Sequence, residues 1–246
     1  MKRRIGRALV AALGVGLNAV AAADVEGHYV TRNLVSDGTI AADHVDANLV
    51  NAWGLTALPG TPWWVADNGT GVATLYDQDG VAQPQPKPLV VALPGAGAPA
   101  APTGAASNAT SDFVITLDGT TAPARFLFAS EDGTISAWTR PPPPAPLPTH
   151  AVVVVDHSAA GAVFKGLALA ATPAGSRLYA TNFHDAVVEV FDGTFAPVAA
   201  PGAFVDPGIP AGFAPFGIMI HGDTVYVTYA KQDAARHDDV KGPHLG

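Results

Sequence analysis

Cysteine is absent from the 246 residues, so this chain can form no disulfide, no thiolate metal site and no cysteine nucleophile. Charged residues are also few, at 14%, whereas 26 glycines and 22 prolines interrupt the chain at short intervals. Amphipathic helices need a charged solvent face, and both glycine and proline disfavour helix interiors. The composition therefore predicts an all-β protein with many turns.

Signature motifs of several enzyme classes are missing as well. The sequence contains no GxSxG nucleophile elbow, no Walker-type phosphate loop, no dinucleotide fingerprint and no HExxH pair. Serine hydrolase, nucleotide-binding and zinc protease functions therefore have no motif support.

The first residues have the pattern of a secretory signal peptide. A start with four basic residues is followed by an apolar run over residues 8–20, which is too short to span a bilayer comfortably. Small residues and Asp24 come next, rather than a positive stop-transfer flank. We expect a signal peptide over 1–23 and one mature domain over 24–246, located in the periplasm or outside the cell. An uncleaved N-terminal anchor is the alternative.

The expected mature part is strongly acidic. Four of the 13 Lys and Arg residues, and none of the 21 Asp and Glu residues, lie in 1–23. The remainder has nine basic and 21 acidic residues, a net charge of −12. Such a surface repels phosphate groups, so we expect neither nucleic acid nor an anionic membrane surface as a partner.

Internal repeats decide the expected fold. Residues 63–77 (WWVADNGTGVATLYD) align without a gap on residues 178–192 (LYATNFHDAVVEVFD). Another copy, residues 126–139 (FLFASEDGTISAWT), fits with a shorter loop, and a last one begins at Val225. Each copy reads as two apolar strands joined by a turn that contains short polar residues and often glycine.

Additional apolar segments complete each repeat. The expected innermost strands are 52–55, 112–117, 165–169 and 215–218. The expected outer strands are 88–93 and 151–156. Gly54, Gly166 and Gly217 are separated by 112 and 51 residues, which indicates a period near fifty. Four strands in such a period are typical of the blades of a β-propeller, of which about four are present.

Two segments stand outside the blade pattern. The proline-rich run 141–148 is expected to be a stiff connector within one blade. Residues 29–35 (YVTRNLV) look like a strand that pairs with a blade near the C-terminus. A partial ring exposes apolar blade flanks and invites aggregation or strand exchange. The simplest interpretation is that the sequence is a piece of a longer protein.

Several strings, including NLVNAWGL, WVADNGTG, ASEDGTISAW, VVVVDHSAAGAVFKGLAL and VTYAKQDAARHDDVKGP, resemble a family of exported bacterial β-propeller proteins. Members often occur in organisms with the PEP-CTERM sorting system. The resemblance spans about residues 33–246. It implies a six-bladed propeller related to NHL-repeat and gluconolactonase-like folds, with two further blades in full-length members, and it carries no established activity.

Candidate functional residues come from equivalent loops, because the turn after the second strand of each blade opens on one face beside the channel. These loops hold Asp67, Asn68, Glu131, Asp132, Asn182 and His184. Oxygen donors of this kind suit a divalent cation such as Ca²⁺. The expected metal ligands are Asp67, Glu131 and Asn182. His184 would be a general base only if the protein is a hydrolase, and no other catalytic residue is assigned. Trp53 and Lys165, near the channel mouth, are further ligand-binding candidates.

The same motifs have a structural alternative. Asp-Asn-Gly and Glu-Asp-Gly are ordinary turn formers, since the short polar side chain bonds its own backbone. Residues 237–239 could ligate a cation, but a solvated loop is favoured. The four tryptophans could form a sugar-stacking platform, but Trp64 and Trp138 are expected to be core residues. The sequence therefore favours an exported, non-catalytic propeller that binds a protein or glycan of the cell envelope or matrix. The alternative function is a channel-metal-dependent lactone or ester hydrolase of gluconolactonase type.

Overall fold

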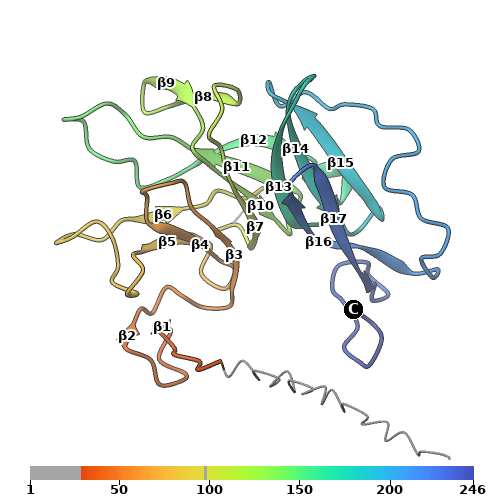
Figure 1. Ribbon diagram of the computed structural model, residues 1–246, viewed down its shortest axis with the longest axis horizontal. Coiled ribbons are helices and arrows are strands. Elements are labelled where there is room, and N and C mark those ends of the chain that lie inside the picture. The colour runs from red at the N-terminus through yellow and green to blue at the C-terminus, as the bar shows by residue number, and fades with distance from the viewer. Residues whose placement is uncertain (1–28, 97–98) are drawn as a thin grey trace, which may run out of the picture. The chain divides into compact units, whose positions relative to one another are not determined.

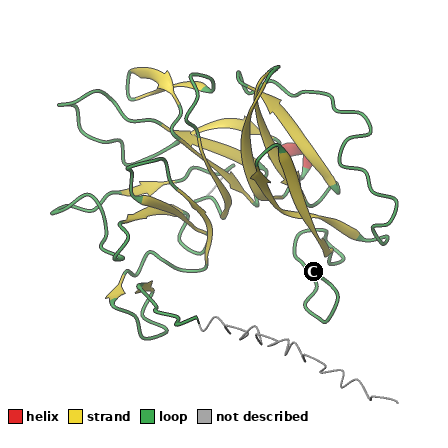
Figure 2. Ribbon diagram, in the orientation of Figure 1, coloured by secondary structure: helices red, strands yellow, loops and turns green. Residues whose placement is uncertain are grey.

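A computed structural model describes residues 29–96 and 99–246, so the expected signal peptide lies outside the described residues. Residues 33–246 form one compact unit. Apart from one short 3-10 turn, η1 (Ser158–Ala160), all regular structure in the described part is β-strand (Figure 2). The all-β prediction is confirmed for this part. No helix within these residues is long and apolar enough to cross a membrane.

The first two blades are complete four-stranded antiparallel sheets (Figure 1). The first runs in the order β3 (Ala52–Thr56), β4 (Trp63–Asp67), β5 (Val72–Tyr76) and β6 (Val90–Ala92). The second runs in the order β7 (Pro102–Ser107), β10 (Phe126–Ser130), β11 (Thr134–Trp138) and β12 (Val152–Asp156). Both outer strands, β6 and β12, lie where the sequence predicts them. The proline-rich run 141–148 connects β11 to β12 within one blade, as expected.

The innermost strand of the second blade is not the one predicted. Residues 114–117 form β8 (Val114–Leu117), which pairs only with β9 (Thr120–Pro123) in a separate hairpin. The turn between them, Asp118 and Gly119, has φ angles of 48° and 76°, the left-handed pair that suits a tight hairpin. The place of the innermost strand is taken by β7 instead, whose sequence PTGAAS carries a weak strand signal.

The last two units have fewer strands. The third consists of β13 (Phe164–Thr172), β14 (Gly175–Asn182) and β15 (Val187–Asp192). The fourth consists of β16 (Phe213–His221) and β17 (Thr224–Lys231). Both units agree with the repeat alignment. The copy at residues 178–192 lies in β14 and β15, and the copy that begins at Val225 lies in β17.

The strand expected over residues 29–35 is wrong in both extent and partner. Residues 29–34 have no strand, and β1 (Val35–Ser36) pairs in parallel with β2 (His44–Val45) rather than with a blade. The carbonyls of Asn33 and Leu34 accept hydrogen bonds from the amides of Asp43 and His44 at 3.0 and 2.9 Å. The segment therefore satisfies its backbone locally, a possibility that residue alternation alone does not reveal.

Successive blades meet through their innermost strands, since β3 contacts β7, β7 contacts β13 and β13 contacts β16. A glycine marks each strand, and the separations of Gly54, Gly104, Gly166 and Gly217 are 50, 62 and 51 residues. Cβ atoms added at the first three would lie 2.5, 2.3 and 2.8 Å from backbone atoms of the next innermost strand. Only glycine permits this approach, so the repeated glycine sets the spacing of the blades.

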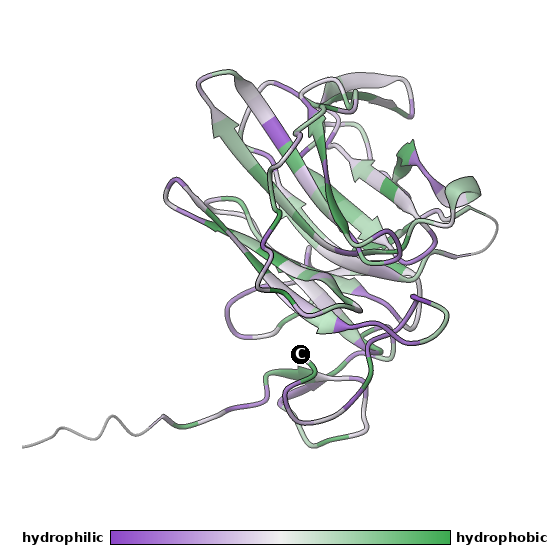
Figure 3. Ribbon diagram, turned by 90° about the vertical axis from the view of Figure 1, so that its right-hand side faces the viewer, coloured by the Kyte–Doolittle hydropathy of each residue, from purple (hydrophilic) through white to green (hydrophobic). Residues whose placement is uncertain are grey.

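The core lies between the sheets, and in Figure 3 the hydrophilic colour gathers mainly in the loops that connect them. Trp64 of the first blade stacks on Phe126 of the second, with ring centroids 4.4 Å apart. Trp64 and Trp138 are 2% and 3% exposed, which confirms their predicted role as core residues. The Trp138 indole N–H donates to the Pro148 carbonyl at 2.9 Å, so the proline-rich connector also satisfies a buried donor.

Candidate functional site

The innermost strands β3, β7, β13 and β16 together line a central hollow of about 310 Å³. Trp53, Thr103, Lys165 and Phe216 contribute side chains to its wall. The Trp53 and Phe216 rings lie 5.6 Å apart between centroids, although they belong to the first and fourth units. Trp53 and Lys165 line one end of this hollow, and Glu131 and Asn68 are hydrogen-bonded in sequence to Lys165. We call these four residues the channel mouth.

Lys165 is the central residue of the channel mouth. Its side chain is only 1% exposed, and its Nζ lies 5.4, 5.8 and 5.9 Å from the ring centroids of Trp53, Phe183 and Phe216. The ammonium donates a hydrogen bond to Glu131 Oε1 and lies 3.5 Å from Asp238 Oδ1. A buried ammonium is costly unless it is paired, so the carboxylate and the three rings account for its position.

A chain of hydrogen bonds connects this ion pair to Trp53. Glu131 Oε2 accepts from Asn68 Nδ2 at 3.1 Å, and Asn68 Oδ1 accepts from Asn51 Nδ2 at 3.0 Å. The Trp53 indole N–H then donates to Asn51 Oδ1 at 3.3 Å. The structure therefore brings together four predicted candidates, Trp53, Asn68, Glu131 and Lys165. It also adds Asn51, which ends the loop before β3 and was missed because it lies outside the repeat-equivalent turns.

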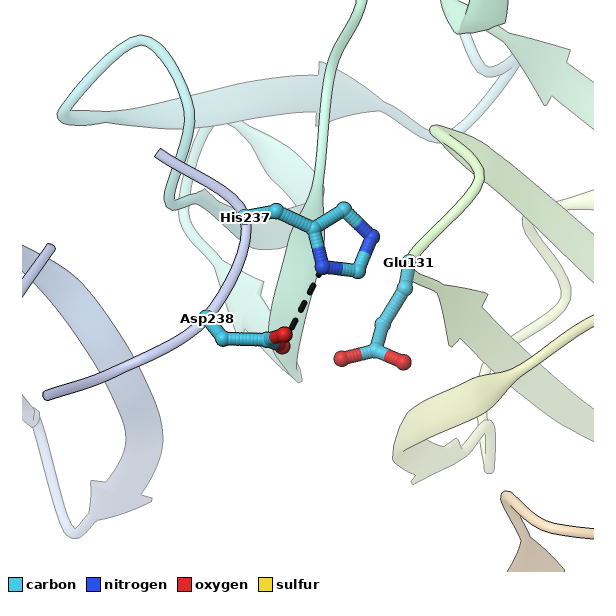
Figure 4. Close-up of side chains that lie close together, drawn as sticks. All are labelled: Glu131, His237 and Asp238. Atoms are coloured by element: carbon cyan, nitrogen blue, oxygen red, sulfur yellow. Dashed lines mark hydrogen bonds and ion pairs between the residues drawn. The ribbon is translucent and has the colours of Figure 1, made fainter. Parts of the chain in front are cut away.

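The loop after β17 also reaches the channel mouth. His237 Nδ1 lies 3.1 Å from Asp238 Oδ1, and ligand atoms of Glu131, His237 and Asp238 all lie within 4.8 Å of one another (Figure 4). Asp233 Oδ1 accepts from the amides of His237 and Asp238 at 2.9 and 3.3 Å, which shapes the loop. The loop is exposed, as expected, but its approach to Lys165 was not foreseen.

The pKa of Asp238 reflects this position. Partial burial raises the pKa of the Asp238 carboxyl, but the hydrogen bond from His237 and the charge of Lys165 outweigh it, so the pKa lies below its ordinary value. The carboxylate is therefore ionised at neutral pH and contributes to the negative charge around Lys165.

Glu131, His237 and Asp238 are ligand types that divalent cations accept. Two of them, however, already face the Lys165 ammonium. At an effective dielectric constant of 20, like charges 4 Å apart repel by about 4 kcal/mol per unit of charge, and a divalent ion doubles this cost. The arrangement therefore suits a built-in ion pair better than a metal site.

Asp67, an expected metal ligand, is fully buried at the end of β4. Its Oδ2 accepts from the Thr74 hydroxyl at 2.8 Å, and its Oδ1 has no hydrogen-bond partner among the described residues. Burial raises the pKa of Asp67 to about 7, the charge of Asp46 adds to the rise, and the bond from Thr74 opposes it. Asp67 makes no hydrogen bond to Glu131 and is sealed from solvent.

Asn182 and His184 belong to a second polar network, in the third blade. Asn182 Nδ2 donates to Asp185 Oδ2 at 2.9 Å and to Glu189 Oε1 at 2.7 Å. Glu189 Oε2 in turn lies 2.8 Å from His157 Nδ1, and His184 Nδ1 lies 3.1 Å from Asp185 Oδ1. Asn182 is thus bound to carboxylates of its own blade, and no hydrogen bond in residues 29–96 and 99–246 joins the three expected metal ligands.

Asp132 shapes a turn, as the structural interpretation of the polar loops predicts. Its Oδ1 accepts from the Thr134 amide at 3.2 Å and from the Thr134 hydroxyl at 2.7 Å, which is a polar turn within the β10–β11 loop. Its Oδ2 accepts from the Ala96 amide at 2.7 Å. Both oxygens therefore hold loops together.

No family profile matches the chain. Its similar curated proteins are viral. Uncharacterized protein R648 of Acanthamoeba polyphaga mimivirus is 32% identical over 209 residues, which cover 81% of this chain and 48% of that protein. Uncharacterized protein L690 of the same virus is 29% identical over 209 residues, covering 81% of this chain and 52% of that protein. The chain therefore spans about half the length of these relatives, which are not members of the bacterial family that the sequence resembles.

Among solved structures, a catalytically inactive variant of virginiamycin B lyase from Staphylococcus aureus with quinupristin is 13% identical. The match has a TM-score of 0.37 and covers 72% of this chain and 62% of the lyase. A PQQ-bound aldose sugar dehydrogenase from Streptomyces coelicolor is 16% identical with a TM-score of 0.31, covering 76% of this chain and 79% of the enzyme. These similarities are too distant to carry an argument about function.

Proposed function

We propose that this chain is an exported, non-catalytic binding protein with propeller architecture, and that its ligand docks at the channel mouth. The observation that carries the proposal is the pairing of Lys165 with Glu131 inside a ring of aromatic side chains. This pairing neutralises the carboxylate that a channel metal would need, so the mouth is equipped for recognition rather than for metal-assisted hydrolysis.

The residues around the ion pair support recognition of a polar partner. Trp53 is half-buried and presents an aromatic ring, and the amides of Asn51 and Asn68 lie next to it. Aromatic rings with adjacent polar groups are enriched in recognition surfaces. Together with the net charge of −12 over residues 24–246, they favour an uncharged or basic partner, such as a glycan or protein of the cell envelope or matrix. We further propose that the signal peptide directs export and that the complete protein closes a six-bladed ring.

A channel-metal-dependent lactone or ester hydrolase is the second candidate. It is favoured by the mutual proximity of ligand atoms from Glu131, His237 and Asp238, within 4.8 Å. In that case the ion would polarise the ester carbonyl or activate a water molecule. The Lys165 ammonium opposes this function, because it competes with the ion for Glu131 and Asp238.

Thermal unfolding separates the two functions. The purified chain is treated with chelator and then titrated with Ca²⁺, Mn²⁺ or Zn²⁺. A metal that binds only the folded state raises the unfolding midpoint once its concentration exceeds the Kd. We expect no shift in the wild type. A shift that disappears in Glu131→Gln would overturn the non-catalytic assignment.

A direct binding experiment tests the channel mouth itself. Cell-envelope polysaccharide and protein fractions are immobilised, and retention of the wild-type chain is compared with that of Trp53→Ala. Trp63→Ala is the matched control, because Trp63 is 46% exposed on β4 and does not line the hollow. Retention lost in Trp53→Ala and kept in Trp63→Ala supports the proposal. Equal retention of all three proteins places the binding surface elsewhere.

A further inference from the structure

A second hollow, of about 240 Å³, lies between the first and second blades and away from the channel mouth. Its apolar lining combines Trp64, Phe126 and Trp138 with proline and leucine side chains, and Arg125 and Arg140 also line it. A shallower groove of about 380 Å³ is lined by the same two arginines. We call the smaller space the arginine hollow.

The two arginines flank neighbouring strands, Arg125 before the start of β10 and Arg140 after the end of β11. Arg125 directly precedes β10, and its amide donates to the Trp138 carbonyl at the end of β11 at 2.8 Å. Arg140 follows two residues after Trp138. Phe126 and Trp138 are direct partners in the β10–β11 register, so these two rings and the arginines belong to one end of one strand pair, and Trp64 approaches them from β4.

The guanidinium groups of Arg125 and Arg140 make no polar contact with the described residues. Within residues 29–96 and 99–246, neither Arg125 nor Arg140 has a side-chain hydrogen bond or ion pair, and no Asp or Glu lines either space. Arg177, by contrast, donates from Nη1 to the Ser176 carbonyl at 2.9 Å. Two adjacent unpaired arginines are unusual in a chain whose acidic residues outnumber its basic residues by 21 to 13. They form a local positive site with planar donors that match a carboxylate.

The wall of the arginine hollow is suited to a ring. Trp64 lies 4.4 Å from Phe126 and 4.8 Å from Trp138 between ring centroids, and each of the three rings is at most 3% exposed, so each presents only a small part of its surface to the hollow. Pro62, Pro84, Leu89 and Leu147 add to the apolar lining. The Trp64 indole N–H also has no hydrogen-bond partner in the described part of the chain, whereas that of Trp138 is bound to Pro148. Pockets for drug-sized ligands measure roughly 300–1,000 Å³, so a hollow of about 240 Å³ indicates a smaller compound.

We infer that the arginine hollow binds a small aromatic carboxylate. The aromatic ring packs against the apolar lining of the hollow, and the carboxylate accepts hydrogen bonds from Arg125 and Arg140. This site lies outside the channel mouth and is independent of the function proposed there. It gives an acidic protein the ability to take up a small anion that the rest of its surface repels.

Three probes of nearly equal size test the inference: phenylacetate, phenylacetamide and phenethylamine. They share the ring and differ in charge. Binding is measured by isothermal titration calorimetry and by quenching of tryptophan fluorescence. Hydrogen bonds to a charged group favour the carboxylate over the amide by about tenfold or more in Kd, and the amine binds more weakly still.

Variants test whether the preference for the carboxylate probe arises from the arginine hollow. The double variant Arg125→Gln and Arg140→Gln is expected to lose the preference for phenylacetate over phenylacetamide, while Arg177→Gln keeps it. Should the double variant fail to fold, Arg140→Gln alone is measured, because Arg140 is exposed and its substitution leaves the core intact. Absence of saturable phenylacetate binding in the wild type, equal affinity for the amide, or an unchanged preference in the folded variant would each overturn the inference.

Discussion

The buried carboxyl of Asp67 makes stability depend on pH in the direction opposite to that of ordinary surface carboxylates. Its pKa is about 7 in the folded chain, compared with 3.8 for an unperturbed aspartate, mainly because burial disfavours the charged form. Between pH 4 and 7 the folded state therefore keeps a proton that the unfolded state has lost. The free energy of unfolding falls as pH rises through this window, and the full penalty applies above pH 7. The two pKa values set a ceiling of about 4 kcal/mol.

Asp67→Asn removes this penalty, because an amide cannot ionise. The amide oxygen still accepts from Thr74, and the amide nitrogen replaces the oxygen that has no partner. The difference in unfolding free energy between the variant and the wild type is expected to grow by roughly 2–4 kcal/mol in favour of the variant as pH rises from 4 to 8. Urea unfolding at pH 4, 6 and 8 measures this difference, with the slope m unchanged between the proteins.

Asp192 is the control with the opposite sign. The hydroxyl and amide of Thr194 hold the pKa of the Asp192 carboxyl below its ordinary value, so its contribution to stability is present at neutral pH and is lost as pH falls. Asp192→Asn should therefore lose stability relative to the wild type at pH 8 and approach it at low pH. Parallel pH profiles for the wild type and Asp67→Asn would refute the reasoning about Asp67.

Three further predictions concern the ion pair, the blade spacing and the core. Lys165→Met leaves two carboxylates without their cation and should cost about 3 kcal/mol or more, while allowing Ca²⁺ or Zn²⁺ to raise the unfolding midpoint. Gly104→Ala places a Cβ 2.3 Å from backbone and should cost at least about 2 kcal/mol by chemical unfolding, whereas Gly208→Ala, in an exposed loop, should change stability little. Trp64→Ala should cost about 3–5 kcal/mol by the same assay, because its ring is 2% exposed.

The part of the site that the sequence predicts follows from the repeats. Asn68 and Glu131 occupy equivalent turns, and equivalent turns of neighbouring blades lie at the same end of the sheets. The Asn68 Nδ2 and Glu131 Oε2 atoms meet there at 3.1 Å. Trp53 and Lys165 belong to innermost strands and therefore line the same space. Asp67 and Asn182 share that alignment, but their side chains are bound within their own blades. Alignment places a residue on a strand or turn and does not determine its side-chain partners.

Strand pairs, their connecting turns and the period near fifty could be determined from the sequence alone, because alternation and turn chemistry act over a few neighbouring residues. The tertiary structure decided what depends on contacts between blades. It selected β7, whose Gly104 fits against the next blade, over the more apolar segment that forms β8. It also brought Asp238 to Lys165 from a distance of 73 residues. Such partners are chosen by proximity in space, and no local pattern in the chain records them.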